Sequence, residues 1–344
     1  MNPRQTKVKI EFKKKKFKKK IDSYLESFSY TDSAAGESDS IDIRVTNRNK
    51  VWNTKWMPER GDIVTAQVLQ KYWRNLNQKK KTLSLRCGIF YVDDITYAGR
   101  PLTCDIGAIS CPIYDKFNTE EVTKTWENTT IQQIANEIAK NAGMAVHYDA
   151  NTISIATVEQ SNQTNCSFLK SICTDFGLMV KIYSNKIIIL DEEKLEEKKA
   201  VCSITESKIT KWSYNETMNG TYTGAKFTYT NPDNDQTIQV NIGGGERIKT
   251  ISVSANNIME AQLKGIAAIN NENKKAITAN ITMPADSRIY AGTNVNLKGF
   301  GKLNGKYFVE KVKHSIGSGY TMTLTLRKVQ KRIKSVAMNA IGGQ

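Results

Sequence analysis

The sequence predicts a mainly β protein with an α/β insert, in which two similar small antiparallel β-barrels flank a domain of two helix–hairpin units. Three observations support this prediction. Short runs that alternate apolar and polar residues fill the first and last parts of the chain, as in half-buried strands. Apolar residues at helical spacing are concentrated in the middle part. Landmarks of the first part recur, in the same order, in the last part.

Changes in periodicity and charge divide the chain into five segments. The length of 344 residues exceeds that of one ordinary domain, so several domains are expected. We expect a basic N-terminal arm, a first β-barrel, an α/β domain, a second β-barrel with a helical insert, and a basic C-terminal tail. These segments span residues 1–20, 21–107, 108–199, 200–330 and 331–344, respectively.

The basic character of the chain is concentrated at its N-terminus. Residues 1–20 contain ten Lys and Arg side chains against Glu11 alone, which accounts for more than half of the net charge of +16. A block of like charges is typical of a mobile arm. Such an arm could neutralise the phosphates of a nucleic acid, contact an acidic protein surface, or stay solvated until the protein assembles.

The two β-rich segments contain short runs with a period of two residues, which indicate antiparallel strands. In the first segment these runs are Phe28–Tyr30, Ile41–Val45, Ile63–Val68 and Ile89–Val92. In the last segment they are Lys226–Tyr229, Ile238–Val240, Ile277–Ile281, Val295–Leu297 and Tyr320–Leu326, and one helix is expected over Ile258–Asn270.

The middle segment predicts two helices, each followed by a hairpin. The first helix covers Ile131–Ala139, with Thr129 as its N-cap and Gly143 as its stop, and the second ends at Gly177. After each helix the same residue types recur at the same spacing: Gly143, Val146, Asn151, Ile153 and Ile155 match Gly177, Val180, Asn185, Ile187 and Ile189. We therefore expect two units of one design, each with a tight turn at its asparagine.

The two β segments share three landmarks, which indicates a duplication. The matches are Phe28–Asp32 with Phe227–Asn231, Gly61–Val64 with Gly292–Val295, and Tyr91–Tyr97 with Phe308–His314. A chain with two such barrels, assembled as a trimer, would place six similar units around one axis. A ring of that kind could join a sixfold partner to a threefold one.

The cysteines and histidines do not form a recognisable metal-binding pattern. Six cysteines are present without a Cys-x-x-Cys pair: Cys87, Cys104, Cys111, Cys166, Cys173 and Cys202. The only histidines, His147 and His314, are far apart in sequence. We therefore expect no zinc site of local spacing, no cofactor, and buried reduced thiols, with disulfides as the alternative.

The chain has no apolar run of about 18–20 residues that could cross a membrane, and its start lacks the apolar region of a signal peptide. We expect it to fold in the cytoplasm.

Other motifs have both a functional and a structural interpretation, and we favour the structural one for each. The acidic residues Asp32, Glu37, Asp39 and Asp42 are expected on an exposed loop, ionised and capping turns, and not as a catalytic carboxylate pair. Gly243–Gly245 lacks the residues of a phosphate-binding loop and is expected to form a flexible hairpin or loop.

Trp52, Trp56 and Trp73 lie among basic residues, which is the pattern of a surface that binds single-stranded nucleic acid. A protein interface or a barrel core uses the same residue types. We interpret these three tryptophans as residues of a protein interface or core. No catalytic triad is visible in the sequence.

The stretch Phe28–Asn47 resembles the signature of the late control protein D family, and so does Trp52–Asp62 with its Pro-Glu-Arg-Gly-Asp end. In that family an aromatic strand leads into an Asp-rich loop, a second strand, an Asn-Arg turn and a Gly-Asp strand start. The family comprises baseplate hub proteins of contractile phage tails, R-type bacteriocins and related injection systems. The resemblance covers about residues 21–330. The basic N-terminal arm departs from the family pattern, and the piercing tip is expected on a separate chain.

The resemblance implies a non-enzymatic baseplate hub without a small-molecule substrate. It implies a homotrimer that forms a pseudo-sixfold ring and joins the hexameric tail tube to the trimeric central spike. It also implies contact with the tape-measure protein and other baseplate proteins, assembly in the bacterial cytoplasm as part of a virion or tail particle, and no membrane insertion by this chain. The alternatives are a basic, barrel-containing nucleic-acid-binding protein and a cell-wall hydrolase carried on the tail.

Overall fold

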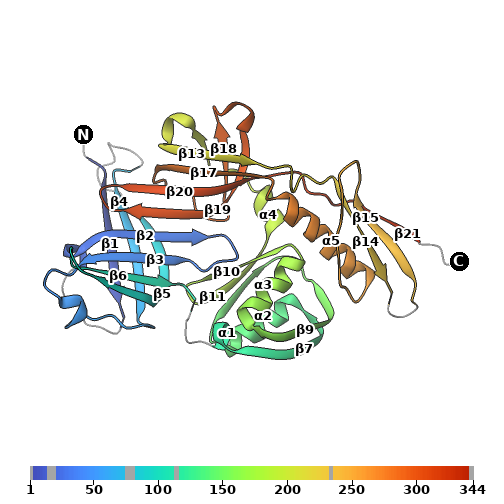
Figure 1. The fold of residues 1–344 in the computed structure, drawn as a ribbon, viewed down its shortest axis with the longest axis horizontal. Coiled ribbons are helices and arrows are strands. Elements are labelled where there is room, and N and C mark those ends of the chain that lie inside the picture. Colours follow the sequence, from blue (N-terminus) through green and yellow to red (C-terminus); the bar gives the residue numbers. More distant parts are fainter. Residues whose placement is uncertain (1–2, 14–20, 74–81, 112–115, 232–234, 341–344) are drawn as a thin grey trace.

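The computed structural model describes residues 3–13, 21–73, 82–111, 116–231 and 235–340. These residues form three structural parts: a large sheet, an α/β module, and a small sheet covered by one helix (Figure 1). Strands β1 and β21 lie at opposite ends of the molecule (Figure 1). The protein is therefore mainly β, as the sequence predicts.

The large sheet contains twelve strands, six from each end of the chain. From the first part come β1 (Gln5–Phe12), β2 (Leu25–Ser33), β3 (Ser40–Thr46), β4 (Ile63–Lys71), β5 (Thr82–Ala98) and β6 (Thr103–Ile109). From the last part come β12 (Cys202–Thr205), β13 (Lys211–Glu216), β17 (Ile277–Pro284), β18 (Asn294–Lys298), β19 (Gly305–Ile316) and β20 (Tyr320–Lys328). Their order is β1-β4-β5-β6-β3-β2-β19-β20-β17-β13, and β18 pairs with both β19 and β12.

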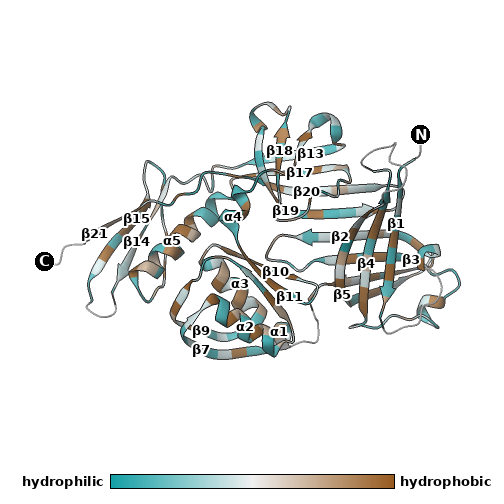
Figure 2. Ribbon diagram, turned by 180° about the vertical axis from the view of Figure 1, so that it is seen from behind, coloured by the Kyte–Doolittle hydropathy of each residue, from teal (hydrophilic) through white to brown (hydrophobic). Residues whose placement is uncertain are grey.

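Each half of the large sheet has its own apolar core. Apolar and polar residues alternate along strands such as β3 and β4 (Figure 2), and these strands bury the face that carries the apolar residues. The first core includes Phe28, Ile43, Val64 and Phe90, and the second includes Ile281, Val295, Tyr307 and Leu324. Among the described residues the strand pairing forms an open path that runs through both halves, so the two closed barrels predicted from the sequence are not confirmed.

Part of the predicted N-terminal arm is a strand. Residues Gln5–Phe12 form β1, which pairs antiparallel with β4 from Gln5↔Lys71 to Phe12↔Val64. Its alternate residues Val8, Ile10 and Phe12 are buried in the first core, while its lysines face outward. The prediction of a free arm is wrong for these residues. It rests on the high number of lysines, which alternate here with the apolar residues of a half-buried strand. Residues 14–20 lie outside the described part of the chain.

The middle part forms the α/β module. It contains α1 (Lys116–Thr119), β7 (Glu121–Thr130), α2 (Ile131–Asn141), β8 (Ala145–Asp149), β9 (Ser154–Thr164), α3 (Asn165–Asp175), β10 (Leu178–Tyr183), β11 (Lys186–Asp191) and α4 (Glu192–Glu197). Both predicted helices are present. The N-cap of α2 is Thr130, whose hydroxyl accepts a hydrogen bond from Gln133 N–H, and not Thr129 as predicted.

The two predicted helix–hairpin units differ in the structure. The second forms its hairpin, in which β10 and β11 are antiparallel and Asn185 has a positive φ of 61°. In the first unit β8 and β9 do not pair. Instead, β8 joins β11 in parallel and β9 pairs with β7. The two units therefore share one sheet, because β11 of the second unit pairs with β8 of the first.

The third part is a small sheet covered by a helix. Its strands are β14 (Gly224–Thr230), β15 (Thr237–Gly243), β16 (Ile248–Thr250) and β21 (Val336–Ala340), and its helix is α5 (Ile258–Asn273). The helix packs tightly on β14 and β15, because a Cβ at Gly265 would lie 2.6 Å from the side chains of Phe227 and Ile242. Four short 3₁₀ turns complete the described structure, at Ile21–Ser23, Val51–Asn53, Glu206–Lys208 and Gly301–Leu303.

Within these described ranges, no helix is both long and apolar enough to span a membrane.

Candidate functional site

Trp52 and Trp56 belong to the first core. Trp52 lies in a 3₁₀ turn with its side chain fully buried. Trp56 is half-buried, and its ring centroid lies 5.8 Å from that of Trp52 in an edge-to-face contact. Tyr24 makes edge-to-face contacts with both rings. Trp52 therefore stabilises the fold, and its fully buried ring is not available to a nucleic-acid base, while Trp56 packs against it.

Trp73 connects the two halves of the sheet. Its ring lies 5.2 Å from that of Tyr320, and its Nε1–H donates a hydrogen bond of 3.1 Å to Thr6 Oγ1. The guanidinium of Arg4 lies over the same ring, 5.1 Å from its centroid. The half-buried ring is thus held by contacts within the chain.

The two halves of the large sheet share detailed backbone features, beginning at a glycine. Gly61 and Gly292, which precede β4 and β18, both have a φ of +86°. The N–H of Gly61 bonds to the carbonyl of Val92, and the N–H of Gly292 bonds to the carbonyl of Val309. Each of these valines is followed by a bulge in its strand, at Val92/Asp94 and at Val309/Lys311. Two sequence landmarks, Gly61–Val64 with Gly292–Val295 and Tyr91–Tyr97 with Phe308–His314, therefore occupy equivalent places.

The strand pairing extends this equivalence to five strands of each half. Ile63 pairs with Tyr91 as Asn294 pairs with Phe308. Continuing from strand to strand, β4, β5, β6, β3 and β2 correspond to β18, β19, β20, β17 and β13, in the same order. Along β2 and β13 the registers match Phe28 with Trp212 and Tyr30 with Tyr214.

The remaining predicted match, Phe28–Asp32 with Phe227–Asn231, is wrong. Phe227 lies in β14 of the small sheet and not in the large sheet. The structural counterpart of Phe-Ser-Tyr-Thr-Asp at 28–32 is Trp-Ser-Tyr-Asn-Glu at 212–216. Its signal in the sequence was a repeat of residue classes, aromatic-Ser-Tyr-polar-acidic, and not of identical residues.

A buried ionic cluster joins three segments of the chain. The ammonium of Lys181, on β10, contacts Asp32 and lies 3.2 Å from the carboxylate of Asp39. Asp32 also accepts a hydrogen bond of 2.8 Å from the N–H of Ala291. Asp39 accepts hydrogen bonds from Ser33 N–H at 3.0 Å and Tyr30 O–H at 3.1 Å. This cluster holds the α/β module against both halves of the sheet.

The prediction that these carboxylates lie on an exposed loop is wrong for Asp32 and Asp39, which are both buried. Burial raises the pKa of Asp39 to about 6, although Lys181 opposes this shift. The spacing of these residues could not reveal the lysine about 150 positions later that neutralises them.

A second ionic cluster surrounds α4. Glu192 lies 3.0 Å from Lys274 at the end of α5, 3.0 Å from Arg327 of β20 and 3.1 Å from Arg332. Arg327 and Arg332 also contact Glu196, at 2.6 and 2.8 Å. Burial opposes ionisation of Glu192, but the three cations outweigh it and hold its pKa below the usual value. The cluster therefore fastens the end of the α/β module to the large sheet and to the small one.

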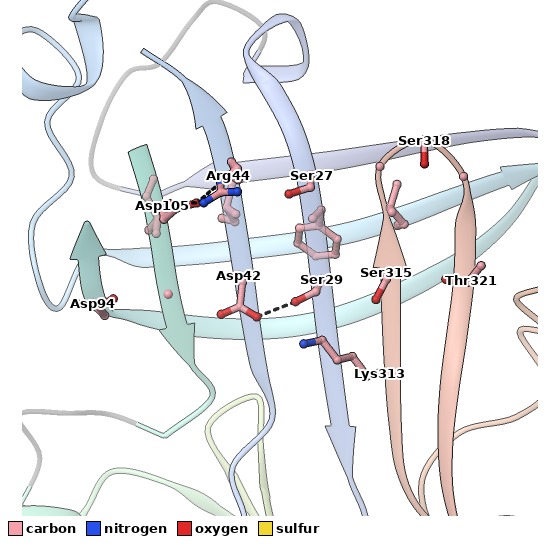
Figure 3. Close-up of a pocket in the computed structure, with 17 residues that line it drawn as sticks. Ser27, Ser29, Asp42, Arg44, Asp94, Asp105, Lys313, Ser315, Ser318 and Thr321 are labelled. Atoms are coloured by element: carbon pink, nitrogen blue, oxygen red, sulfur yellow. Dashed lines mark hydrogen bonds and ion pairs between the residues drawn. The ribbon is translucent and has the colours of Figure 1, made fainter. Parts of the chain in front are cut away.

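The exposed face of the large sheet carries mainly small polar side chains, and an open hollow of about 590 Å³ lies on it. Figure 3 shows these side chains on neighbouring strands. Arg44 makes two hydrogen bonds to Asp105, of 2.7 and 2.9 Å, and Ser29 donates one of 2.6 Å to Asp42. Arg44 and Asp105 are thus paired with each other in the hollow, and Asp42 accepts its hydrogen bond from a serine.

The two histidines contribute no exposed acid–base group at this hollow. His314 is buried beneath the sheet, where its ring stacks on Tyr30 and its Nδ1 lies 2.9 Å from Tyr320 Oη. Desolvation lowers the pKa of His314 to about 4. His147 is on β8 of the α/β module.

Within the described residues no group of three or more His, Cys, Asp and Glu side chains is placed to hold a metal ion. All six cysteines are free thiols; five are buried and Cys202 is half-buried.

Solved structures of tail proteins share this fold. The 43 kDa tail protein of prophage MuSo2 from Shewanella oneidensis superposes with a TM-score of 0.70 at 13% identity, covering 94% of this chain and 98% of that one. A tail protein from Neisseria meningitidis has a TM-score of 0.70 at 12% identity, covering 94% and 96%. The E. coli c3393 protein, a component of the type VI secretion system, has a TM-score of 0.57 at 10% identity, covering 95% and 78%.

No protein-family model matches the chain, and no curated protein matches its sequence. At sequence identities of 10–13% over nearly the whole chain, these structures show a shared fold. The chain therefore has the fold of prophage tail proteins, the class of protein to which its resemblance to the late control protein D family points.

Proposed function

We propose that this chain is the structural baseplate hub of a contractile, phage-like tail and that it acts without catalysis. The observation that carries the proposal is the duplicated five-strand unit, with its matching glycines, bulges and register. Three copies of a chain with two such units provide six similar units around one axis. A pseudo-sixfold ring of this kind suits a position between a hexameric tail tube and a trimeric central spike.

In this proposal each half of the sheet acts as one small barrel-like unit, and the division into residues 21–107, 108–199 and 200–330 describes the assembly units. The α/β module and the small sheet lie outside the duplicated strands, so they are available for the spike and other baseplate proteins. The polar face of the sheet would face the lumen, where the tape-measure protein ends. Assembly takes place in the bacterial cytoplasm, and the chain becomes part of the virion or tail particle.

The test is the solution mass of the purified chain, measured by light scattering alone and together with the tube and spike proteins encoded beside it. We expect a particle of three times 38.7 kDa, in at least one of these mixtures. A monomer under every condition would contradict the hub.

Nucleic-acid binding is the second candidate, because the net charge is +16. Burial of Trp52 and the internal contacts of Trp73 speak against a stacking surface. Deleting residues 1–20 would remove β1, so the sharper test replaces the lysines of residues 14–20 by glutamine. If the chain is a hub, the variant should keep the oligomeric mass of the unmodified chain. The unmodified chain should then show no salt-dependent affinity for DNA that is lost in the variant.

A cell-wall hydrolase is the third candidate. We expect the purified chain to release no fragments from isolated peptidoglycan, and release of such fragments would contradict the proposal of a purely structural protein.

A further inference from the structure

Inside one chain, the two halves of the sheet meet by edge pairing. After its bulge, β19 pairs antiparallel with β2, from Lys311↔Ser33 to Ile316↔Phe28. At this internal boundary His314 of β19 stacks on Tyr30 of β2, with ring centroids 5.8 Å apart and planes within 7°. The boundary thus joins the post-bulge strand of one unit to the first strand of the other.

The counterparts of these two strands each have an open edge. The counterpart of β19 after its bulge is Asp94–Ala98 of β5, which pairs with β6 on one side, while β4 ends opposite Tyr91. The counterpart of β2 is β13, the last strand of the sheet, which pairs only with β17 among the described strands. Each chain therefore has a second copy of both strands of the internal boundary. These copies, the post-bulge part of β5 and β13, do not pair with each other within the chain.

Large side chains at these two open edges are exposed, whereas their counterparts at the internal boundary are buried. Tyr97 of β5 and Trp212 of β13 are 38% and 42% exposed. Their counterparts His314 and Phe28 are 2% and 1% exposed. Equivalent positions are thus buried where a neighbouring unit covers them and exposed where none does.

We propose that the post-bulge part of β5 in one copy pairs with β13 of the next copy, in the register of the internal β19–β2 boundary. In this register Tyr97 lies opposite Tyr214 of the neighbouring copy, Thr96 opposite its Asn215, and Gly99 opposite its Trp212. The partner is a second copy of this chain. The inference rests on the proposed ring, whose subunit contact it specifies.

The open edges suit such a contact. An unpaired strand edge presents N–H and C=O groups that another strand can satisfy. Each copy has one edge of each kind, so the contact is head-to-tail and continues from copy to copy until a ring closes. The Tyr97 hydroxyl already donates a 2.9 Å hydrogen bond to the carbonyl of Trp52, which holds the ring in place before the neighbour arrives.

The test is an engineered cross-link between Thr96→Cys and Asn215→Cys in one chain, under mild oxidation with copper phenanthroline. Residues directly opposite in an antiparallel pair have Cα atoms about 4.5–5.5 Å apart, which a disulfide spans. We expect most of the protein to run as a covalent trimer on a non-reducing gel. The single variants should stay uncross-linked.

Two matched controls define the register. Thr31→Cys with Lys313→Cys reproduces the same pair at the internal boundary, where Lys313 is opposite Thr31. On oxidation this variant should form a disulfide within one chain, so it should lose two thiols and still run as a monomer on the non-reducing gel. Thr96→Cys with Ser213→Cys places the cysteines diagonally, about 7–8 Å apart, and should cross-link poorly.

The outcomes separate this inference from the proposed function. A trimer by light scattering in which T96C/N215C fails to cross-link, while the internal control closes, overturns the edge pairing and leaves the hub intact. A ladder of covalent oligomers without a limit at three supports the edge pairing and contradicts the threefold ring. A chain that stays monomeric with every partner overturns both.

Discussion

Lys181 illustrates how one residue can determine the position of a domain. Its ammonium is the cation between two carboxylates whose side chains are 8% and 0% exposed, and it comes from a different structural part of the chain. Removing one member of a buried ionic cluster leaves charge without compensation, which costs more than a surface ion pair contributes.

We predict that Lys181→Met lowers the free energy of unfolding by about 3–5 kcal/mol. Lys7→Met is the matched control, because the Lys7–Asp22 pair is largely exposed and should contribute about 1 kcal/mol or less. Urea denaturation at pH 7.5 measures both. Equal losses in the two variants would mean that water reaches Asp32 and Asp39.

His314 should make stability depend on pH. Its folded pKa of about 4 lies below its ordinary value near 6.5, so the unfolded chain binds the proton more tightly. The stability from the neutral, buried imidazole is complete above pH 6.5 and is lost as the pH falls toward 4. By pH 5 the loss should be about 2 kcal/mol.

The His314→Gln variant isolates this contribution. The raised pKa of Asp39 acts in the opposite direction, because its stability contribution is lost as the pH rises through about 6. Urea denaturation of the unmodified chain and of the variant at pH 7.5 and pH 5 gives the difference. An equal pH dependence in both proteins would contradict the assignment of His314.

At the scale of elements, the duplicated glycines offer a direct test of equivalence. Both Gly61 and Gly292 have a φ of +86°, where an L-residue is strained. We predict that Gly61→Ala and Gly292→Ala each cost about 1–2 kcal/mol. Gly244→Ala should cost less, because Gly244 has an ordinary φ and a Cβ added there would meet no atom within 4 Å. Thermal unfolding of the three variants measures this, and unequal effects at the first two sites would weaken the duplication.

Elements whose signal is local could be predicted from the sequence, and those that depend on remote partners could not. The spacing of Ile131, Ile134 and Ile138 is sufficient to indicate α2, since all three are buried on one face. By contrast, the pairing of β8 with β11 depends on a strand about 40 residues away. Period-two runs cannot specify which strands pair, so closed barrels and an open path look alike in the sequence.

The sequence was sufficient to predict that the β segments are duplicated, but not which strands correspond to one another. The sequence located the duplication and two of its three landmarks, whereas the third depended on the register of five strands. The interface assignment of the three tryptophans stays a prediction, and their basic neighbours in the sequence do not reveal that Trp52 is fully buried. Exposure of Tyr97 and Trp212, on which the proposed contact between copies rests, is a property of the folded chain alone.

At the scale of the whole molecule, buried ionic clusters join the three structural parts, beside an apolar cluster that includes Met179, Leu195 and Phe308. The α4 cluster joins Glu192 to Arg327, which is 135 residues away in sequence. The side chains of both residues are at most 5% exposed. Such a cluster favours one arrangement of its parts, because any other arrangement leaves buried charges without partners.

We predict that Arg327→Met lowers the free energy of unfolding by about 3–5 kcal/mol. Adding Glu192→Gln to this variant should lower it much less than Glu192→Gln does in the unmodified chain. The reason is that Arg327 and Glu192 compensate each other, so their effects cannot add. Native-state hydrogen exchange should show the amides of α4, β20 and the end of α5 becoming faster together in Arg327→Met. Lys334→Met, which removes an exposed contact to Glu193, should leave those amides unchanged. If the two buried substitutions add, or if only β20 exchanges faster, Arg327 stabilises its own strand and the relative position of the three parts depends on other contacts.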